Sequence, residues 1–535
     1  MSVNKVKSAP GRYGIGVVII GFLCWSWRFI YESSFITIDR YRSYSLFDDA
    51  MISMRYAWNF SHGYGLVWNQ GEYVQGYTNL LMVLIMSFAT LVLSKTMAVL
   101  AIQVSGVFFM LVIAYFNMQI AGIVFSAETG QDTSLLRVLA FLSGMAYYPL
   151  IYWSLMGMET GLLTIFLMAS IFFALKYVRS LESRYLFLVA VLGGLAFLTR
   201  NDTILYFIGL WVYMGAASLR DKGGRHSPFQ HLAAIGLYFI FIMGQLGFQY
   251  LYYGDLLPNT FVLKLTGMSF FDRVQNGLGF VWLFIKETAL AFLLALTGFC
   301  IQARKDKALL FYLVVVSVLY QVYLGGDPWL YWRMMAPTMP LLLLLCIDAA
   351  FALVRRAPIS NMSPSINLKR GLALMLIILG LVSMNFRFLS EISFRSRPYQ
   401  VTRNARNVNT AIVLNDVLRE DATVGVFWAG TIPYYVDNAA IDFLGKSDRY
   451  IANLPPDMSG AAGFFGMTSV PGHNKYDLTY SIVTLRPTYI PKLFYGGQDV
   501  SPVIGDQYVR VKYRYITLLL LKSSSDVNWE KLNLP

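Results

Sequence analysis

Long apolar runs, separated by short polar segments, fill most of the chain as far as residue 388. A helix needs about 20 apolar residues to cross a bilayer, within a range of about 17–25. The pattern predicts helices over residues 14–29, 79–94, 97–124, 136–154, 160–175, 185–199, 203–218, 232–253, 278–303, 308–324, 335–354 and 371–388. We therefore expect a polytopic α-helical membrane protein.

The positions of the basic residues predict the topology. Basic segments lie at the N-terminus, at Lys176 to Arg184, at Arg220 to Arg225, at Arg304 to Lys307 and at Arg355 to Arg370. The positive-inside rule assigns all of them to the cytoplasmic side. Five apolar segments precede Lys176, and an odd number of crossings cannot return the chain to the same side. Segment 79–94 is among the shortest and follows a long polar loop, so we expect it to be re-entrant or interfacial. About eleven crossings then remain, and the C-terminus lies outside the cytoplasm.

The composition of the chain changes after Phe388. Residues 389–535 contain short apolar runs between Pro and Gly turns, which is typical of a small α/β domain. The expected organisation is a membrane domain over 1–388, with a first external loop at 30–78, and an extracytoplasmic domain over 389–535. The first apolar run shows no small-residue cleavage site, which predicts an uncleaved anchor.

Composition and charge exclude several classes of function. With 56% hydrophobic and only 14% charged residues, the chain is unlike an ordinary soluble enzyme. Much of the net charge of +13 falls in the short loops, where it indicates orientation rather than nucleic-acid binding. The four histidines are scattered, and the sequence has no Walker, Rossmann or zinc-ligand pattern. These features speak against a nucleotide-driven pump and against a nucleotide-sugar donor.

Two adjacent carboxylates, Asp48 and Asp49, lie in the predicted loop 30–78. Adjacent carboxylates at a membrane surface are costly unless they are solvated, paired or bound to a metal. A carboxylate can also take a proton from an acceptor hydroxyl during glycosyl transfer. The alternative is structural, because Asp ahead of a helical run is a favoured N-cap, and we expect that role for one of the pair.

Further carboxylates and cations recur in the other predicted outer loops. Glu159 lies at the start of a helix, whose N-terminus would stabilise its charge. Arg200 and Asp202 occupy a tight turn, where they could form a local salt bridge or present a guanidinium to a phosphate. Lys264 and Arg333 lie at the outer interface, where snorkelling to solvent is the simpler explanation. Three cations beside carboxylates on one face nevertheless predict a site for an anionic lipid head group.

Seven segments, taken in order, resemble one enzyme family. They are FDDAMISMRYAWNFSHGYGLVWNQGEYVQGYTNLL, GMET, LTRNDTIL, YYGDLLPNTFVLK, GGDPWLYWRMMAPTMPLL, IPYYVDNAAIDFLGKSDRYIA and PGHNK. The first resembles the first external loop of GT-C glycosyltransferases. The ordered set is most similar to the mycobacterial terminal arabinofuranosyltransferases and their bacterial relatives, which include pilin arabinosyltransferases. The resemblance extends from the first loop to about residue 480.

The resemblance implies an inverting glycosyltransferase that takes a sugar from a polyprenyl-phosphate carrier. Its multi-pass chain would lie in the cytoplasmic (inner) membrane, with the active site outside the cytoplasm. The family pattern implies a catalytic base at Asp48 or Asp49 and a second catalytic acidic residue at Glu159. The scheme requires no cofactor and no metal, although these three carboxylates could bind a divalent ion.

The same resemblance implies how the donor and acceptor are bound. Arg200, with Arg333 and Lys264, would hold the donor phosphate. The candidate substrate-binding residues are Arg55, Asp202, Asp255, Asn259, Asp327, Trp329, His473 and Lys475. The last two belong to the PGHNK segment of the C-terminal domain, whose role the resemblance does not settle. We expect that domain to cap the site and help choose the acceptor, or alternatively to have a purely structural role.

The expected partners are a polyprenyl-phosphate-linked sugar, an acceptor and the lipid bilayer, with no nucleic acid. The resemblance favours a pentofuranose donor such as arabinofuranose, and an acceptor that is an envelope glycan or an exported protein such as pilin. The alternative function is a transporter or flippase for a lipid-linked saccharide. Transporters of this kind usually contain repeated halves and broken helices at the membrane midplane, and the sequence shows no repeated halves.

Overall fold

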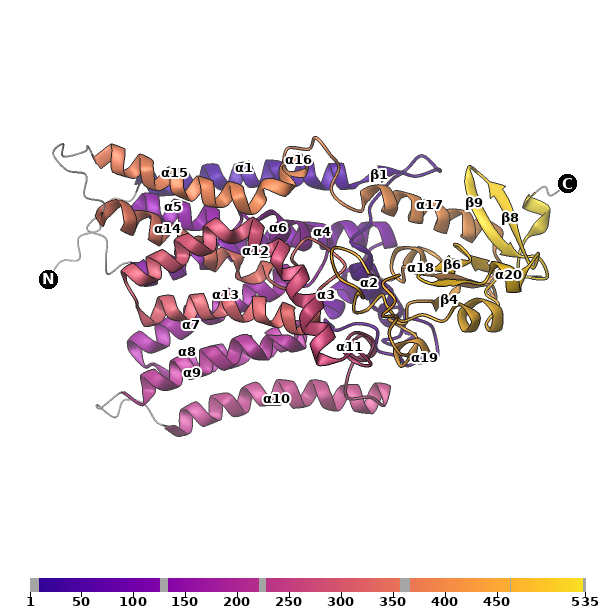
Figure 1. Ribbon diagram of the computed structural model, residues 1–535, viewed down its shortest axis with the longest axis horizontal. Coiled ribbons are helices and arrows are strands. Elements are labelled where there is room, and N and C mark those ends of the chain that lie inside the picture. Colours follow the sequence, from indigo (N-terminus) through magenta and orange to yellow (C-terminus); the bar gives the residue numbers. More distant parts are fainter. Residues whose placement is uncertain (1–8, 126–132, 221–227, 357–365, 462, 533–535) are drawn as a thin grey trace.

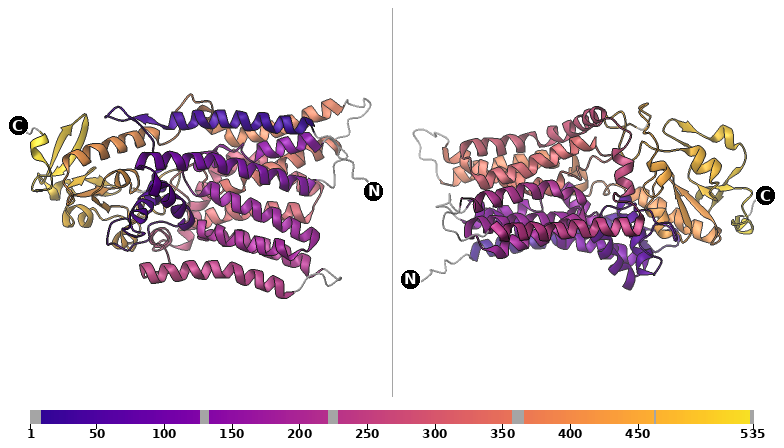
Figure 2. Two further views of the ribbon diagram at one scale, coloured as in Figure 1. Left: turned by 180° about the vertical axis from the view of Figure 1, so that it is seen from behind. Right: turned by 90° about the horizontal axis from the view of Figure 1, so that it is seen from below.

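In the computed structural model, residues 9–125, 133–220, 228–356, 366–461 and 463–532 are described. A long helical bundle carries a small domain at one end, which we call the domain end (Figure 1). Both views in Figure 2 show the bundle helices running side by side along the long axis, with the C-terminal domain beyond their ends. The predicted division into membrane helices followed by a small mixed domain is confirmed as a fold.

The helices of the bundle match the predicted apolar segments. They are α1 (Ala9–Ser33), α4 (Lys95–Phe125), α5 (Thr133–Ser143), α6 (Tyr148–Leu155), α7 (Thr160–Ser180), α8 (Ser183–Thr199), α9 (Ile204–Ser218), α10 (Pro228–Tyr253), α12 (Phe270–Ile301), α13 (Lys305–Leu324), α14 (Met339–Arg356) and α15 (Ile366–Asn385). Within the described ranges, eight helices are long and apolar enough to cross a membrane, or nine if the bent pair α5 and α6 is one span. The shorter α8 and α9 pack beside α7 in the same bundle. Because α8 and α9 are shorter than the helices that meet this criterion, the number of eleven crossings stays a prediction.

One predicted crossing is not a single straight helix. Segment 136–154 is broken between α5 and α6, which are bent by 55° relative to each other. Gly144 lies at the break, where a Cβ atom would come within 2.6 Å of the Cα of Ala114 on α4. A proline also stands in the first turn of α6, where its missing N–H costs no hydrogen bond. Close packing on α4 and the new helix start at α6 therefore explain why this segment is not one continuous helix.

The domain end of the bundle is built from shorter helices. They are α2 (Asp48–Ser61), α3 (Leu80–Val92) and α11 (Asn259–Leu265). The helix α3 has 13 residues, too few to cross a bilayer, and it packs chiefly on α2 (Figure 1). This agrees with the prediction that segment 79–94 does not cross. The hairpin of β1 (Phe35–Ile36) and β2 (Arg42–Ser43) precedes α2.

The C-terminal domain contains a five-stranded mixed sheet with the order β4-β3-β5-β9-β8. Its strands are β3 (Thr423–Val426), β4 (Ala439–Asp442), β5 (Tyr489–Ile490), β8 (Tyr508–Tyr513) and β9 (Ile516–Leu521). The first three strands are parallel, while β9 pairs antiparallel with both β5 and β8. The accompanying elements are α16 (Leu389–Ile392), α17 (Val401–Val417), α18 (Thr431–Tyr435), α19 (Arg449–Ala452), α20 (Ser501–Ile504), β6 (Phe494–Tyr495) and β7 (Gln498–Asp499). The short apolar runs of the sequence thus form the strands β3, β4, β8 and β9. The apolar run around residues 479–484 forms a helical turn instead.

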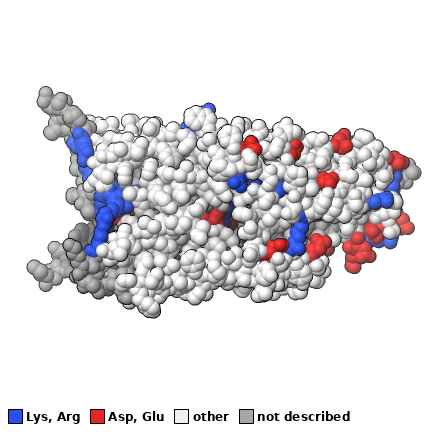
Figure 3. Space-filling view, turned by 60° about the horizontal axis from the view of Figure 1, so that its bottom comes forward, with Lys and Arg blue, Asp and Glu red and all other residues white. Residues whose placement is uncertain are grey.

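Charge is distributed unevenly along the molecule. Lys and Arg side chains gather at the end of the bundle away from the C-terminal domain, and a broad uncharged zone follows (Figure 3). Carboxylates and cations are mixed at the domain end. The predicted basic residues Lys5, Lys7 and Arg225, and the segment 357–365, lie outside the described residues. The described part of the surface therefore has the charge asymmetry expected of a membrane protein.

Candidate active site

The first turn of α2 brings Asp49 to the junction between the bundle and the C-terminal domain. Its carboxylate forms an ion pair with Lys446 of the domain and a second one with Arg333, whose Nη1 lies 3.1 Å from Oδ2 of Asp49. The Asp49 side chain is 18% exposed and that of Arg333 only 6%. Burial by itself would raise the pKa of Asp49, but the Lys446 and Arg333 cations outweigh it and hold that pKa well below its ordinary value.

A second carboxylate lies on the other side of Arg333. Asp327, in the loop between α13 and α14, has Oδ2 at 3.5 Å from Nη2 of Arg333. Its Oδ1 accepts a hydrogen bond from the backbone N–H of Trp329 at 3.0 Å, which fixes the turn. The guanidinium of Arg333 is thereby held between Asp49 and Asp327 inside the protein.

Lys264 and His473 complete this group of charged and polar side chains. The stem of Lys264, on α11, packs over Gly472, where a Cβ atom would lie 3.1 Å from Cε of Lys264. Burial and the Arg333 guanidinium lower the pKa of Lys264 to about 8. Burial and the Lys446 ammonium lower the pKa of His473 to about 3, so this imidazole is neutral at pH 7. We call the set Asp49, Lys264, Asp327, Arg333, Lys446 and His473 the central cluster.

Several buried polar atoms around the central cluster lack a hydrogen-bond partner among the described residues. They are both ring nitrogens of His473, Nε of Arg333 and Nε1 of Trp329. The rings of His473 and Trp329 lie 6.0 Å apart in an edge-on arrangement. Buried polar groups are normally paired. Unpaired atoms concentrated in one place therefore indicate a site for a polar ligand.

Asp48, the neighbour of Asp49, has a different role. Its Oδ1 accepts the backbone N–H of Thr431 at 2.9 Å, and its Oδ2 accepts that of Gly430 at 3.2 Å. Burial raises the pKa of Asp48, and the hydrogen bond from Thr431 opposes this. The expectation that one of the pair caps its own helix is wrong, because Phe47 is the N-cap of α2 and both carboxylates lie in the first turn. Asp48 instead binds the free N–H groups at the start of α18 in the C-terminal domain.

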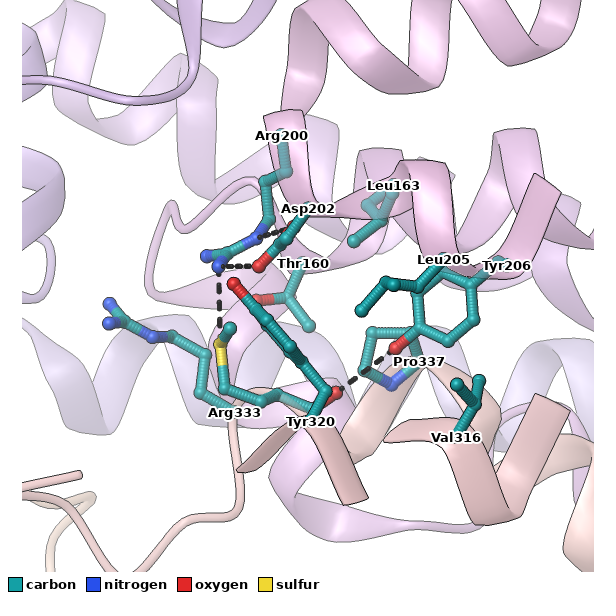
Figure 4. Close-up of a pocket in the computed structure, with 11 residues that line it drawn as sticks. Thr160, Leu163, Arg200, Asp202, Leu205, Tyr206, Val316, Tyr320, Arg333 and Pro337 are labelled. Carbon is teal, nitrogen blue, oxygen red and sulfur yellow. Dashed lines mark hydrogen bonds and ion pairs between the residues drawn. The ribbon is translucent and has the colours of Figure 1, made fainter. Parts of the chain in front are cut away.

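Arg200, Glu159 and Asp202 form a second, separate group, of which Figure 4 shows Arg200 and Asp202. Arg200 donates from Nη1 to Glu159 at 2.7 Å, and from Nη2 and Nε to Asp202 at 2.5 and 3.0 Å. Glu159 also accepts a hydrogen bond from Asn79 at 3.2 Å. The predicted local salt bridge between Arg200 and Asp202 is present, but it is buried and not exposed at a surface turn, because the three charged side chains are at most 14% exposed. Glu159 occupies the N-cap position of α7 but makes no capping hydrogen bond, since its oxygens bind Arg200 and Asn79.

A narrow pocket connects this second group with the central cluster. Its lining includes Arg200, Asp202 and Arg333 at the polar side, and apolar residues of α9, α13 and the start of α14 elsewhere (Figure 4). The space inside it, counted out to open solvent, is about 360 Å³. The pocket thus joins a charged site to an apolar groove.

Two predicted site residues, Asn259 and Lys475, stabilise the junction around the cluster. Asn259 donates from Nδ2 to the carbonyl oxygens of Gly445, Lys446 and Asp448 at 2.8 to 3.1 Å. Lys475 donates to the carbonyl of Ala452 at 2.7 Å and to α11 and the residue after it. These contacts hold the Lys446 loop and the helix that carries Lys264.

Arg55 also lies apart from the central cluster. Its guanidinium donates to backbone oxygens of Trp68, Pro433 and Asn438 and to the side chain of Asn69, so each nitrogen has a partner. This residue fastens the loop after α2 to the C-terminal domain.

Asp255 lies apart as well, at the surface. It forms an exposed ion pair with Arg449 at 2.7 Å. The structure therefore places Asp255 away from the central cluster.

One residue of the central cluster, Lys446, was not predicted as a site residue. Lys446 supplies one of its cations, and Asp442 builds the turn that presents it by accepting the backbone N–H groups of Leu444 and Ser447. Burial raises the pKa of Asp442 to about 6. Both lie in the segment IDFLGKSDRYIA, whose family resemblance was the available signal.

Three carboxylates, Asp48, Asp49 and Glu159, were considered for a divalent metal. Asp48 accepts hydrogen bonds from backbone N–H groups, and Asp49 forms ion pairs with two cations. Glu159 binds Arg200 and Asn79. In the described part of the chain, no group of three or more His, Cys, Asp or Glu residues is arranged to hold a metal ion. These carboxylates, as arranged, do not form a shared metal site.

Comparison with known proteins shows which family and which solved structures this chain resembles. Residues 394–529 match a family described as a domain of unknown function (DUF8728). A search of curated proteins finds no match. The structure of ArnT from Cupriavidus metallidurans bound to undecaprenyl phosphate aligns with a TM-score of 0.53 and 12% identity, over 79% of this chain and 85% of that one. The chain is similar in fold to ArnT.

Two further structures align less closely. ArnT from the same organism in the apo state gives a TM-score of 0.45 and 10% identity, over 81% of this chain and 86% of that one. The oligosaccharyltransferase of Archaeoglobus fulgidus in the apo form aligns with a TM-score of 0.45 and 13% identity, over 80% of this chain and 64% of that one. The comparison with ligand-bound ArnT thus establishes a polytopic helical fold with a small C-terminal domain, and the arabinofuranosyltransferase subfamily stays a prediction.

Proposed function

We propose that the protein is a membrane glycosyltransferase that moves a sugar from a polyprenyl-phosphate carrier to an acceptor. The observation that carries the proposal is the central cluster, in which Lys264, Arg333 and Lys446 surround Asp49 and unpaired polar atoms remain. A buried excess of cations suits an anionic head group. The fold relative ArnT was solved with undecaprenyl phosphate bound, which supports a carrier of this class.

In this proposal Arg333 and Lys264 hold the donor phosphate. Arg333 has an unpaired Nε and the fork geometry that suits phosphate oxygens. The pocket lined by Arg333 continues into apolar residues such as Leu205 and Val316, which suit a prenyl chain. Arg200 has donors committed to Glu159 and Asp202, so its assignment to the phosphate stays a prediction.

Asp49 is the residue we assign as the general base. It takes the proton of an acceptor hydroxyl while the hydroxyl oxygen attacks the anomeric carbon and the carbon–oxygen bond to phosphate breaks, with inversion. Lys446 and Arg333 by themselves hold the pKa of Asp49 too low for a good base. An incoming phosphate shares these cations and so raises the basicity of Asp49. The charge that develops on the leaving phosphate is stabilised by Lys264 and Arg333.

The finer identity of the substrates rests on the sequence resemblance alone. It favours a pentofuranose such as arabinofuranose as the sugar, and an envelope glycan or an exported protein such as pilin as the acceptor. The concentration of Lys and Arg at the end away from the domain supports a cytoplasmic-membrane orientation with the site outside.

The experiment uses the full-length protein in detergent, with undecaprenyl phosphate as the probe. We expect Lys264→Ala and Arg333→Ala each to weaken binding at least tenfold, whereas Lys522→Ala, at an exposed surface pair, leaves it unchanged. Vesicles loaded with polyprenyl-phosphoryl arabinofuranose then report whether a new glycosidic bond forms. Equal binding by all three variants would refute the site, and translocation without a new bond would favour the transporter alternative.

A further inference from the structure

A second cleft lies on the C-terminal domain, outside the central cluster. Its lining residues are Leu454, Pro455, Pro456, Asp457, Ser459, Asn474, Tyr476, Asp477, Gly497 and Gln498. The space inside it, counted out to open solvent, is about 870 Å³. This is large enough for a few sugar rings and is open to solvent on one side.

The cleft and the central cluster share structural elements. His473 belongs to the cluster, and the next residue, Asn474, lines the cleft. The carbonyl of Asn474 accepts the backbone N–H of Asp457 at 2.6 Å, which ties the two walls together. At the rim, Pro456 packs against Gly267, just beyond the helix that carries Lys264. A molecule in the cleft is therefore next to the segments that hold the proposed donor site.

The chemistry of the lining is polar and acidic. Asp457 and Asp477 contribute carboxylates, and no Lys or Arg is among the lining residues. The side-chain oxygen of Asn474 is buried and has no partner among the described residues, although its amide nitrogen donates to Ser469 at 2.9 Å. Gln498, an exposed residue, accepts the N–H of Leu478 with its side-chain oxygen at 2.8 Å. Hydrogen-bonding groups thus line one part of the cleft, and two proline rings form an apolar rim.

We propose that this cleft binds the acceptor, and that the acceptor is a saccharide chain without negative charge. The assignment rests on the proposed glycosyltransferase function and names its second substrate class. Carboxylates and amides bind sugar hydroxyls, and the proline rings offer apolar surface to the apolar faces of sugar rings. The two carboxylates repel anionic glycans and tolerate neutral or amino sugars. A basic peptide is the competing occupant, and the experiment separates the two.

The binding experiment uses the full-length protein in detergent and needs no donor. The probes are chitotetraose, tetraglucosamine, tetragalacturonate and a lysine tetrapeptide. We expect the first two to bind and tetragalacturonate not to bind. Asp457→Asn should weaken chitotetraose binding about tenfold, because a hydrogen bond to a charged group is lost. If the lysine tetrapeptide bound while neither chitotetraose nor tetraglucosamine did, the proposal would be overturned.

Two further variants keep the result interpretable. Asn at position 457 can still accept the N–H of Ser459 and bond to the Tyr476 hydroxyl, so the fold should be retained. Ser459→Trp, at an exposed position, blocks the cleft and should abolish saccharide binding. Asp506→Asn is the matched control, since Asp506 is 95% exposed elsewhere on the domain, and it should bind like the wild type. Wild-type binding by both Asp457→Asn and Ser459→Trp would overturn the proposal.

Undecaprenyl phosphate binding to the same preparations separates this inference from the proposed function. We expect Asp457→Asn and Ser459→Trp to bind undecaprenyl phosphate as the wild type does. If the wild type bound saccharides but not undecaprenyl phosphate, the proposed function would fail while the cleft remained a saccharide site. If it bound undecaprenyl phosphate but no saccharide, only the cleft assignment would fail.

Discussion

Lys446 and Asp49 form an ion pair between residues that lie 397 positions apart in the sequence. Asp49 belongs to the helix after the first loop, and Lys446 to the C-terminal domain. The same carboxylate also binds Arg333 at 3.1 Å. The C-terminal domain is therefore part of the candidate site, and the central cluster exists only when the domain is docked on the bundle.

The two neighbouring aspartates should respond differently to the same substitution. Asp49→Asn is expected to lower the transfer rate about 100- to 10,000-fold, the usual contribution of a general base. The same variant should bind undecaprenyl phosphate at least as tightly as the wild type, because Lys446 and Arg333 lose a competing anion. Asp48→Asn should instead destabilise the protein by about 1–3 kcal/mol, since an amide N–H₂ faces a backbone N–H. Full transfer activity in both variants would rule out a base at either position.

Arg200 can be tested through its partner Glu159. Arg200→Ala leaves two buried carboxylates uncompensated, which costs about 3–5 kcal/mol, so this variant should unfold at a lower temperature. Adding Glu159→Gln removes one of the charges and should recover part of the stability and part of the transfer rate. If the double variant were stable but still lost at least 100-fold in transfer, Arg200 would belong on the donor phosphate.

Donor binding should depend on pH through Lys264. Its pKa is lowered to about 8, so the ammonium is charged below that pH and becomes neutral above it. The affinity for undecaprenyl phosphate is therefore expected to fall by up to about tenfold per pH unit above about 8. Lys264→Arg keeps its charge throughout this range and should remove the decline. An identical pH profile in the wild type and Lys264→Arg would contradict the assignment.

Asn259 should affect the site without contacting the substrate. Asn259→Ala removes the donor that holds three carbonyl oxygens around Lys446, at a cost of about 1–3 kcal/mol. We expect a lower unfolding temperature together with weaker undecaprenyl phosphate binding, which Asn259→Gln restores only in part. The matched control in the same loop is Asp255→Asn, which breaks an exposed ion pair worth about 0–1 kcal/mol. Indistinguishable behaviour of Asn259→Ala and Asp255→Asn would remove the positioning role.

The sequence predicts the membrane helices well because the signal is local. Each span is an apolar run whose length matches the bilayer, and every predicted run became a helix or, at 136–154, a bent pair. The bend escaped prediction because one of its two causes is the close packing of Gly144 on Ala114 of another helix. The sequence shows the glycine at this place, but it does not show the helix against which the glycine packs.

The site is less predictable because its partners are distant in the sequence. Asp48 lies ahead of a helical run and so resembles an N-cap, yet the N–H groups that it binds belong to Gly430 and Thr431. Lys446 lies in a polar stretch where a cation is unremarkable, and only its partner Asp49 gives it a role. Arg333, by contrast, was recognisable, because the sequence places it with two other cations beside carboxylates on one predicted face.

The way the central cluster is assembled has a consequence for biosynthesis. Asp49 leaves the ribosome early, Lys264 and Arg333 follow midway, and Lys446 and His473 come last. A nascent chain with most of its helices inserted therefore holds Asp49 without Lys446 beside it. In the proposed enzyme, catalytic competence would arise in a single late step, when the final domain folds onto the helices already made. Unfinished chains would then leave the lipid-linked sugars around them untouched.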